Sequence, residues 1–150
     1  MNVRARHSEA VGLTKFQLYK KTYARIDRAI SSGFHIEAVA LLESIICDRL
    51  ESLLTVLTEE PVNASTIGKL LDKLKKFNAI SPALEVELRR WNKERGLVIH
   101  QFVKITTNTE TSWNSRLRYA RDTALHGKEV LRSLRKETDR LIRTSHKRNV

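Results

Sequence analysis

The segment Trp91–His100 contains the two side chains best suited to chemistry, Arg95 and His100. Arg95 lies in the middle of an apolar helical stripe, four residues after Trp91 and three before Val98, where a charge is costly unless it has a partner or a function. His100 follows five residues later, and histidine is the side-chain type whose unperturbed pKa allows proton exchange near neutral pH. This placement of a charge and a histidine marks the segment as the candidate functional site.

An arginine and a histidine suffice for cleavage of RNA without a metal ion. RNA carries its own nucleophile, the 2′-hydroxyl, and a histidine can remove its proton or protonate the leaving 5′-oxygen. A guanidinium can hold the phosphate through two hydrogen bonds and stabilise the charge that develops on it. DNA lacks the 2′-hydroxyl, so the same pair would not cleave it in this way. Arg95 and His100 are therefore the two residues that could carry out this reaction.

The sequence offers little support for other enzyme classes. It contains no CxxC, HExxH, GxSxG or glycine-rich phosphate loop, and its five histidines show no metal-ligand spacing with acidic residues. This argues against a metalloenzyme and against a nucleoside triphosphate hydrolase, and we expect neither a metal nor another cofactor. The single Cys47 fits a reducing compartment, and its apolar surroundings predict a small buried side chain.

No apolar run approaches the roughly 18 residues needed to span a bilayer, and no secretion signal is visible. We therefore expect a cytoplasmic protein that does not bind membranes. The net charge is +11, and it is unevenly distributed: residues 34–60 carry one basic and six acidic side chains, whereas the segments on both sides are basic. This balance favours a polyanionic partner, nucleic acid first. The alternative is a solvated basic surface that serves only solubility.

Helical periodicity dominates the chain and strand-like alternation is absent, which predicts an all-α single-domain bundle of about five helices with a long C-terminal helix. We expect a flexible tail over 1–13, a helical domain over 14–146 and a short tail over 147–150. Thr14 is a plausible N-cap of the first helix, whose stripe begins at Phe16.

Further helix boundaries follow from caps and turns. The first helix is predicted to end at Ser31–Gly33, and the second to span about 34–57 with an apolar face wide enough for a central helix. A short third helix is capped by Ser65 or Thr66. Ser81 and Pro82 open a fourth helix that ends near Ile105. After a polar loop over 106–111, a fifth helix of about 30 residues begins at Ser112.

Glu43 lies inside the apolar stripe of the second helix, four residues after Val39 and three before Ile46. The second helix therefore carries an acid on its buried side, as the fourth carries the base Arg95. A Glu43–Arg95 ion pair is the simplest way to satisfy both charges.

The exposed faces of the fifth helix are basic, and we identify five of its arginines as candidate phosphate contacts: Arg116, Arg118, Arg121, Arg132 and Arg135. A solvated face is the alternative interpretation. Trp91 and Trp113 could stack on bases, but both lie on apolar stripes, so core packing is favoured.

The motif Arg95-Gly96-Leu97-Val98-Ile99-His100 is R-x4-H. In the fourth helix of an all-α domain it resembles the HEPN superfamily, whose signature is R-x4–6-H in a late helix of a four- or five-helix bundle. The order of helices resembles that family over about 15–145, and the sequence mainly over 84–105. Many HEPN proteins are metal-independent endoribonucleases of toxin–antitoxin, phage-defence or RNA-processing systems.

The resemblance implies a homodimer in which two R-x4–6-H motifs form one composite site, with RNA as substrate and an antitoxin or other protein as a further partner. Arg95 and His100 would be catalytic, supported by Glu43, Asn92 and Gly96. Two positions depart from the family. The residue after the arginine is commonly asparagine in the ribonucleases but is Gly96 here, and one toxin branch has tyrosine where this chain has Phe102.

Two other functions remain open. One is a catalytically inactive HEPN-like module that binds a nucleic acid or a protein, since inactive members of the family exist. The other is a helical regulator that binds DNA, although no helix-turn-helix is evident.

The spacing of the motif also sets a geometric condition. Five residues turn an ideal helix by about 500°, so Arg95 and His100 should lie about 140° apart. We expect them to meet either through a π-bulge near Gly96 or across a dimer. The alternative is that Arg95 pairs only with Glu43 and that His100 is an ordinary surface histidine.

Overall fold

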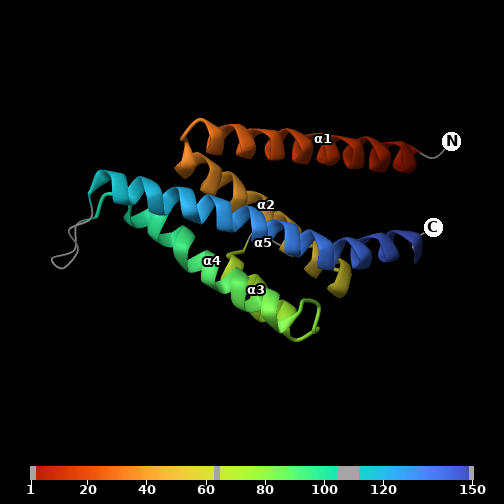
Figure 1. Ribbon diagram of the computed structural model, residues 1–150. Helices are drawn as coiled ribbons and strands as arrows, with labels where there is room; N and C mark the ends of the chain where they lie inside the picture. Colours follow the sequence, from red (N-terminus) through yellow and green to blue (C-terminus); the bar gives the residue numbers. More distant parts are fainter. Residues whose placement is uncertain (1–2, 63–64, 105–111, 149–150) are drawn as a thin grey trace.

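The computed structural model describes the backbone of residues 3–62, 65–104 and 112–148, and the side chains of 14–62, 65–104 and 112–142. Within these ranges all regular structure is helical, which confirms the predicted all-α bundle of five helices with a long C-terminal helix (Figure 1). The helices are α1 (Val3–Ser31), α2 (His35–Thr58), α3 (Ile67–Lys75), α4 (Pro82–Gln101) and α5 (Trp113–Arg148).

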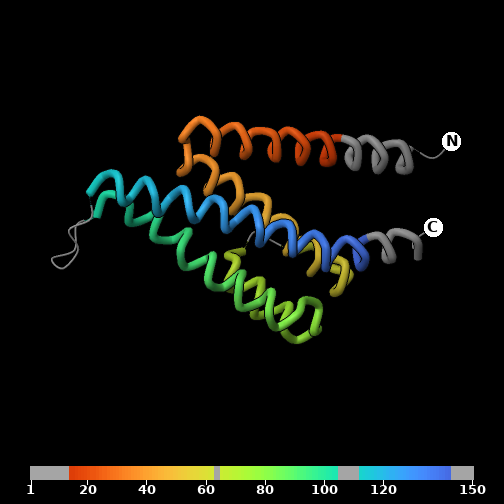
Figure 2. Tube along the Cα trace, in the orientation of Figure 1, coloured from red at the N-terminus to blue at the C-terminus, as the bar shows by residue number. Residues whose placement is uncertain are grey.

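Helix α2 is the centre of the fold. It contacts each of the other four helices. In the described part of the chain α1 and α4 make no contact with each other, and they lie on opposite sides of α2. Helix α5 lies across α2 between α1 and α4 (Figure 2). The apolar residues of α2 that face these neighbours are fully enclosed, among them Leu42, Ile46 and Leu50. The wide apolar face predicted from the sequence therefore belongs to a central helix.

Three predicted helix ends are confirmed. At the end of α1, Gly33 adopts a left-handed backbone conformation with a φ of +82°. Phe34 N donates a hydrogen bond to Ala29 O at 2.8 Å, which is the bond typical of a helix that ends at such a residue. The Thr66 side chain accepts a hydrogen bond from Lys69 N at the start of α3. The side chain of Ser81, which directly precedes Pro82, accepts a hydrogen bond from Leu84 N at the start of α4.

Other boundaries differ from the prediction. Helix α1 begins at Val3, so Thr14 lies inside the helix and the backbone of 3–13 is helical rather than a tail. These residues contain no proline, and Ala, Arg and Glu favour a helix, so nothing forces a start at Thr14. Phe16, the first residue of the predicted stripe, is 68% exposed. At the other end of the chain, α5 continues to Arg148, into the predicted tail over 147–150.

Helix α4 ends at Gln101, earlier than predicted, and Ile105 and the loop over 106–111 lie outside the described residues. This early end explains the position of Trp113. It is 63% exposed and contacts Phe102 edge-to-face with ring centroids 5.3 Å apart, so its predicted core role is wrong. At the first turn of α5, the described part of α4 offers no further residue beneath the indole.

Trp91, in contrast, is fully buried between α4 and α5. Its Nε1 donates to Thr123 O at 2.9 Å. A Cβ on Gly127 would lie 2.6 Å from that nitrogen, so the indole can pack on α5 only because residue 127 has no side chain. This contact sets the distance between α4 and α5 and hence the position of the residues on either side of Trp91.

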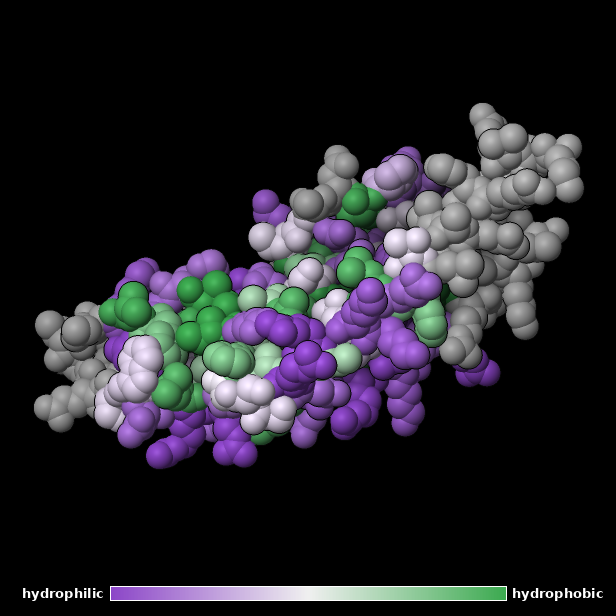
Figure 3. Space-filling view, turned by 90° about the horizontal axis from the view of Figure 1, so that it is seen from above, coloured by the Kyte–Doolittle hydropathy of each residue, from purple (hydrophilic) through white to green (hydrophobic). Residues whose placement is uncertain are grey.

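The surface on the α1 side is largely hydrophilic, with hydrophobic residues gathered toward one end (Figure 3). Among the described residues, no helix combines the length and apolar character needed to cross a membrane.

Candidate functional site

Arg95 faces α2 from the middle of α4, and its side chain is only 13% exposed. Its Nη1 lies 2.9 Å from Glu43 Oε1, which confirms the ion pair expected from the two apolar stripes. The pair joins two neighbouring helices at a place where neither charge would otherwise be solvated well. A partly buried pair of this kind holds both side chains in place.

Asn92 provides a second contact to the same guanidinium. Its Oδ1 accepts a hydrogen bond from Arg95 Nη2 at 2.7 Å, one turn earlier on α4. The remaining donor, Nε of Arg95, is buried and has no hydrogen-bond partner among the described residues. Glu43 and Asn92 therefore hold the two terminal nitrogens of Arg95 in place.

His100 is exposed, and its Nε2 lies 3.4 Å from Arg95 Nη1 within the same chain. Because a guanidinium can only donate, Nε2 is the acceptor in this contact, which assigns the ring proton to Nδ1. The contact places the imidazole of His100 against the Arg95 guanidinium at the surface of the molecule.

The predicted need for a π-bulge or a second chain to bring Arg95 and His100 together is wrong. Helix α4 is α-helical from Pro82 to Gln101. The separation of about 140° applies to the directions of the Cα–Cβ bonds. The arginine side chain is long, and side chains on a helix lean toward its N-terminus, so His100 leans back toward Arg95.

Gly96, directly after Arg95, faces open space. A Cβ built there would meet nothing within 4 Å. The packing of α4 therefore does not require glycine at this position, and residue 96 contributes no polar group to the site.

Cys47 lies close to the Arg95–Glu43 pair. It packs against the hydrophobic core, as expected for a small buried side chain, but it is only partly buried. It follows Glu43 by one turn of α2, at the edge of the apolar face. Burial raises the pKa of the thiol to about 11, with the charges of Glu43 and Glu51 adding to the rise and Arg95 opposing it. The thiol is therefore protonated at neutral pH, which makes Cys47 a poor nucleophile.

The five arginines of α5 fall into different environments. Arg116 donates to the main-chain oxygens of Phe102 and Lys104, the latter at 2.8 Å, and so caps the C-terminal end of α4. Its two terminal nitrogens are thus already hydrogen-bonded to the main chain. The other four are exposed on α5: Arg118, Arg121, Arg132 and Arg135.

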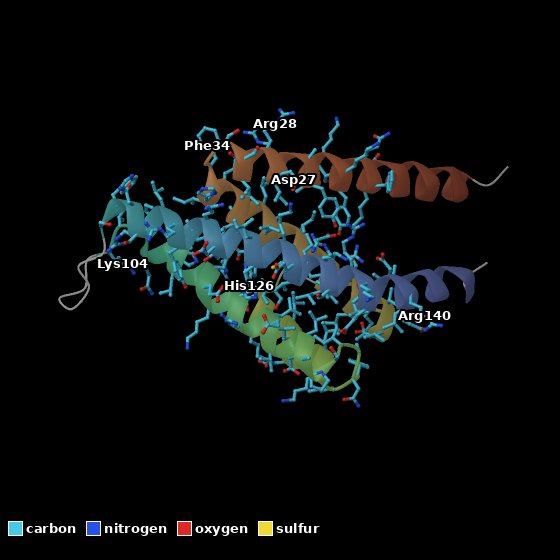
Figure 4. The ribbon with its side chains drawn as sticks, viewed as in Figure 1. Asp27, Arg28, Phe34, Lys104, His126 and Arg140 are labelled. Atoms are coloured by element: carbon cyan, nitrogen blue, oxygen red, sulfur yellow. The ribbon has the colours of Figure 1, made fainter. Side chains whose placement is uncertain are left out.

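A second histidine cluster was not predicted. Figure 4 shows His126 on α5. It lies between two carboxylates of α4, with Nδ1 2.7 Å from Glu94 and Nε2 2.8 Å from Glu87. Burial lowers the pKa of His126, but its hydrogen bonds to Glu94 and Glu87 outweigh burial and raise the pKa overall. Only the imidazolium can donate to both oxygens at once. The seven-residue spacing of Glu87 and Glu94 on one flank of α4 was the available signal.

Among the described residues, no group of three or more histidine, cysteine or acidic side chains is arranged to hold a metal ion. No protein-family model, curated protein or solved structure matches the chain. The chemical capacity of the site therefore rests on its own geometry, in which the Nε2 of an exposed imidazole lies next to an oriented guanidinium. Such a pair can exchange protons with a hydroxyl group and stabilise a neighbouring negative charge.

Proposed function

We propose that this protein is a metal-independent endoribonuclease whose catalytic residues are Arg95 and His100. The observation that carries the proposal is the contact of 3.4 Å between Arg95 Nη1 and His100 Nε2, with His100 exposed to solvent. The net charge of +11 supports RNA as the substrate, because a polyanion is attracted to such a surface.

In the proposed reaction, the phosphate of RNA replaces His100 in the contact with Arg95, and the Nε2 lone pair of His100 that this frees takes the proton of the 2′-hydroxyl. The 2′-oxygen then attacks the adjacent phosphorus, and the bond from phosphorus to the 5′-oxygen breaks. The leaving oxygen receives a proton, so the products are a 2′,3′-cyclic phosphate and a 5′-hydroxyl. Arg95 stabilises the negative charge on the phosphate as the bonds change. Glu43 and Asn92 are positioning residues, since they act on the phosphate only through Arg95.

The reaction requires both a base and an acid, whereas one chain supplies one exposed histidine at the site. The resemblance to HEPN proteins favours a homodimer in which the second His100 provides the acid. In this interpretation the protein is a ribonuclease of toxin or phage-defence type, and an antitoxin or another protein is its regulatory partner.

The second candidate function is a catalytically inactive HEPN-like module that binds a nucleic acid or a protein. The observation that favours it is the enclosure of Arg95, whose terminal nitrogens already contact Glu43 and Asn92. Gly96 adds to this argument, because the side chain at that position offers no hydrogen bond to a phosphate.

The experiment that separates the two is RNA cleavage by purified protein in EDTA, with wild type beside Arg95→Ala and His100→Ala. Substrates are a DNA strand containing one ribonucleotide and the matching all-DNA strand. Cleavage only at the ribonucleotide, leaving a 2′,3′-cyclic phosphate and lost in both variants, is the expected result. Binding of RNA without cleavage by the folded wild type would favour the inactive module.

A further inference from the structure

A cleft between α1 and α5 lies on the other side of α2 from Arg95, because it is bordered by α1, which makes no contact with α4. Its volume is about 270 Å³. Its polar lining consists of Tyr23 and Asp27 from α1 and of Lys128, Arg132 and Arg135 from α5. Figure 4 shows Asp27 on α1 above α5. The cleft thus contains three cations and one carboxylate, away from the candidate catalytic site.

The three cations occupy one face of α5, since positions 128, 132 and 135 are spaced by four and three residues. Lys128 is the one that pairs with the carboxylate, with its Nζ 2.5 Å from Asp27 Oδ1. Arg132 is exposed and makes no ion pair with a described residue. The positive charge of the two arginines is therefore not balanced within the cleft.

Arg135 is held in a defined orientation by Tyr23. Its guanidinium carbon lies 4.7 Å from the centroid of the Tyr23 ring. Stacking of this kind occupies the face of the guanidinium and leaves the N–H donors in its plane available. The Tyr23 hydroxyl is buried and has no hydrogen-bond partner among the described residues. The cleft therefore holds an oriented arginine with free donors beside an unsatisfied hydroxyl.

We propose that this cleft binds a phosphodiester group of a nucleic-acid strand, with Arg132 and Arg135 as the phosphate ligands. A volume of about 270 Å³ is slightly below the roughly 300–1,000 Å³ of pockets that enclose whole small molecules, which suits one phosphate group rather than a nucleotide. Two adjacent arginines match the oxygens of a phosphate. This goes beyond the proposed function, because a strand held here is bound on the opposite side of α2 from Arg95.

The test is fluorescence anisotropy with a labelled 2′-O-methyl RNA oligonucleotide, which cannot be cleaved through its 2′-oxygen. The double variant Arg132→Gln/Arg135→Gln is compared with Lys73→Gln/Lys75→Gln on α3, which loses the same charge from a helix that touches neither α1 nor α5. We expect about a tenfold weaker Kd for the arginine variant and less than about a twofold change for the lysine variant. The slope of log K against log salt should fall by about 1.4, or roughly 0.7 per lost phosphate contact.

The single variant Arg132→Gln is a control for lost packing on Tyr23, because Arg135 is the residue that stacks on that ring. It should retain the wild-type unfolding transition and still bind several-fold more weakly. Equal losses in the two double variants, or no loss in the arginine variant, would overturn the proposal. Since the oligonucleotide is not a substrate, this result is independent of whether Arg95 and His100 cleave RNA.

Discussion

His100 and His126 are the same type of side chain in opposite situations on the two flanks of α4. The ring of His126 is enclosed between Glu87 and Glu94, and its side chain is 17% exposed. His100 is at the surface, and its described contact is to Arg95 through Nε2. One histidine uses both ring nitrogens to join α4 to α5, whereas the other keeps Nδ1 available.

The difference separates a histidine that holds two helices together from the one that we propose to be catalytic. A ring whose two nitrogens are both hydrogen-bonded to carboxylates stabilises the packing of two helices and cannot readily exchange a proton with a substrate. A ring beside a fixed guanidinium, with one nitrogen exposed, is suited to proton transfer. The buried Trp91 lies on the apolar stripe of α4 between these two flanks. It therefore separates the residues around His126 from those around Arg95.

Breaking the Arg95–Glu43 pair is expected to have the largest effect on stability. Glu43→Ala leaves a guanidinium of 13% exposure without its carboxylate, and we expect a loss of about 2 kcal/mol in the free energy of unfolding, less than for a fully buried pair because Glu43 is 30% exposed. Urea denaturation measures it. The double variant Glu43→Gln/Arg95→Met should lose less than the sum of its two single variants. Simple additivity would show that the two charges are not coupled.

Changing the contact between α4 and α5 should have the next largest effect. In Gly127→Ala the new methyl group would lie 2.6 Å from Trp91 Nε1 and 3.0 Å from Leu42 Cδ1, so the helices must move apart. We expect a net loss of about 1–2 kcal/mol after the gain in helix propensity. Gly96→Ala is the matched control, because nothing lies within 4 Å, and it should stabilise by about 0.5–1 kcal/mol. Stabilisation by both substitutions would contradict the close contact.

Removal of the enclosed histidine should cost stability that depends on pH. The folded-state pKa of His126 is raised above 6.5, so its contribution is fully present below about pH 6.5 and is lost as the pH rises through the folded-state value. His126→Gln should therefore cost about 1 kcal/mol near pH 6 and less near pH 9. The difference between wild type and variant is the quantity to measure, because the pKa of His35 is lowered by burial and by Arg121 and opposes the trend in wild type.

His100→Gln is the control for the same pH series. Its side chain is exposed, so the free energy of unfolding should change by less than about 0.5 kcal/mol at each pH. A pH-dependent loss as large as that of His126→Gln would remove the distinction between the two histidines.

The substitution with the smallest expected effect on stability is at Gly96, where the site has space for a side chain. Gly96→Asn has space for its side chain and should alter stability by only a few tenths of a kcal/mol. If the amide orients a phosphate, as the proposed HEPN resemblance implies, cleavage should rise several-fold. Gly96→Ala separates this effect from helix stabilisation, and an equal rise in both variants would argue against a role for the amide.

The charges on the apolar stripes made the Arg95–Glu43 pair predictable, since periodicity alone placed both side chains on the buried faces of their helices. The caps at Gly33, Thr66 and Ser81 were predictable for a similar reason, because each depends on a local residue type. The position of His126 was not, because it depends on how α5 is rotated and shifted against α4. Trp113 shows the same limit: its stripe position is correct, but the described part of α4 ends before it can cover the ring.

The contact between Arg95 and His100 was missed for another reason. Backbone angles describe where side chains start, and a long arginine bridges the gap between two such directions. The pair is therefore formed within one chain, and the homodimer remains a proposal based on the need for a second proton-transfer group.

The most direct test of the account is the rate of RNA cleavage in EDTA by wild type, His100→Ala and His126→Gln, each confirmed to be folded under the conditions of the assay. We expect wild type to cleave, His100→Ala to lose roughly 100-fold or more, and His126→Gln to remain within a few-fold of wild type. Absence of cleavage by the wild type, or similar losses in both variants, would contradict the proposal that His100 is the catalytic histidine.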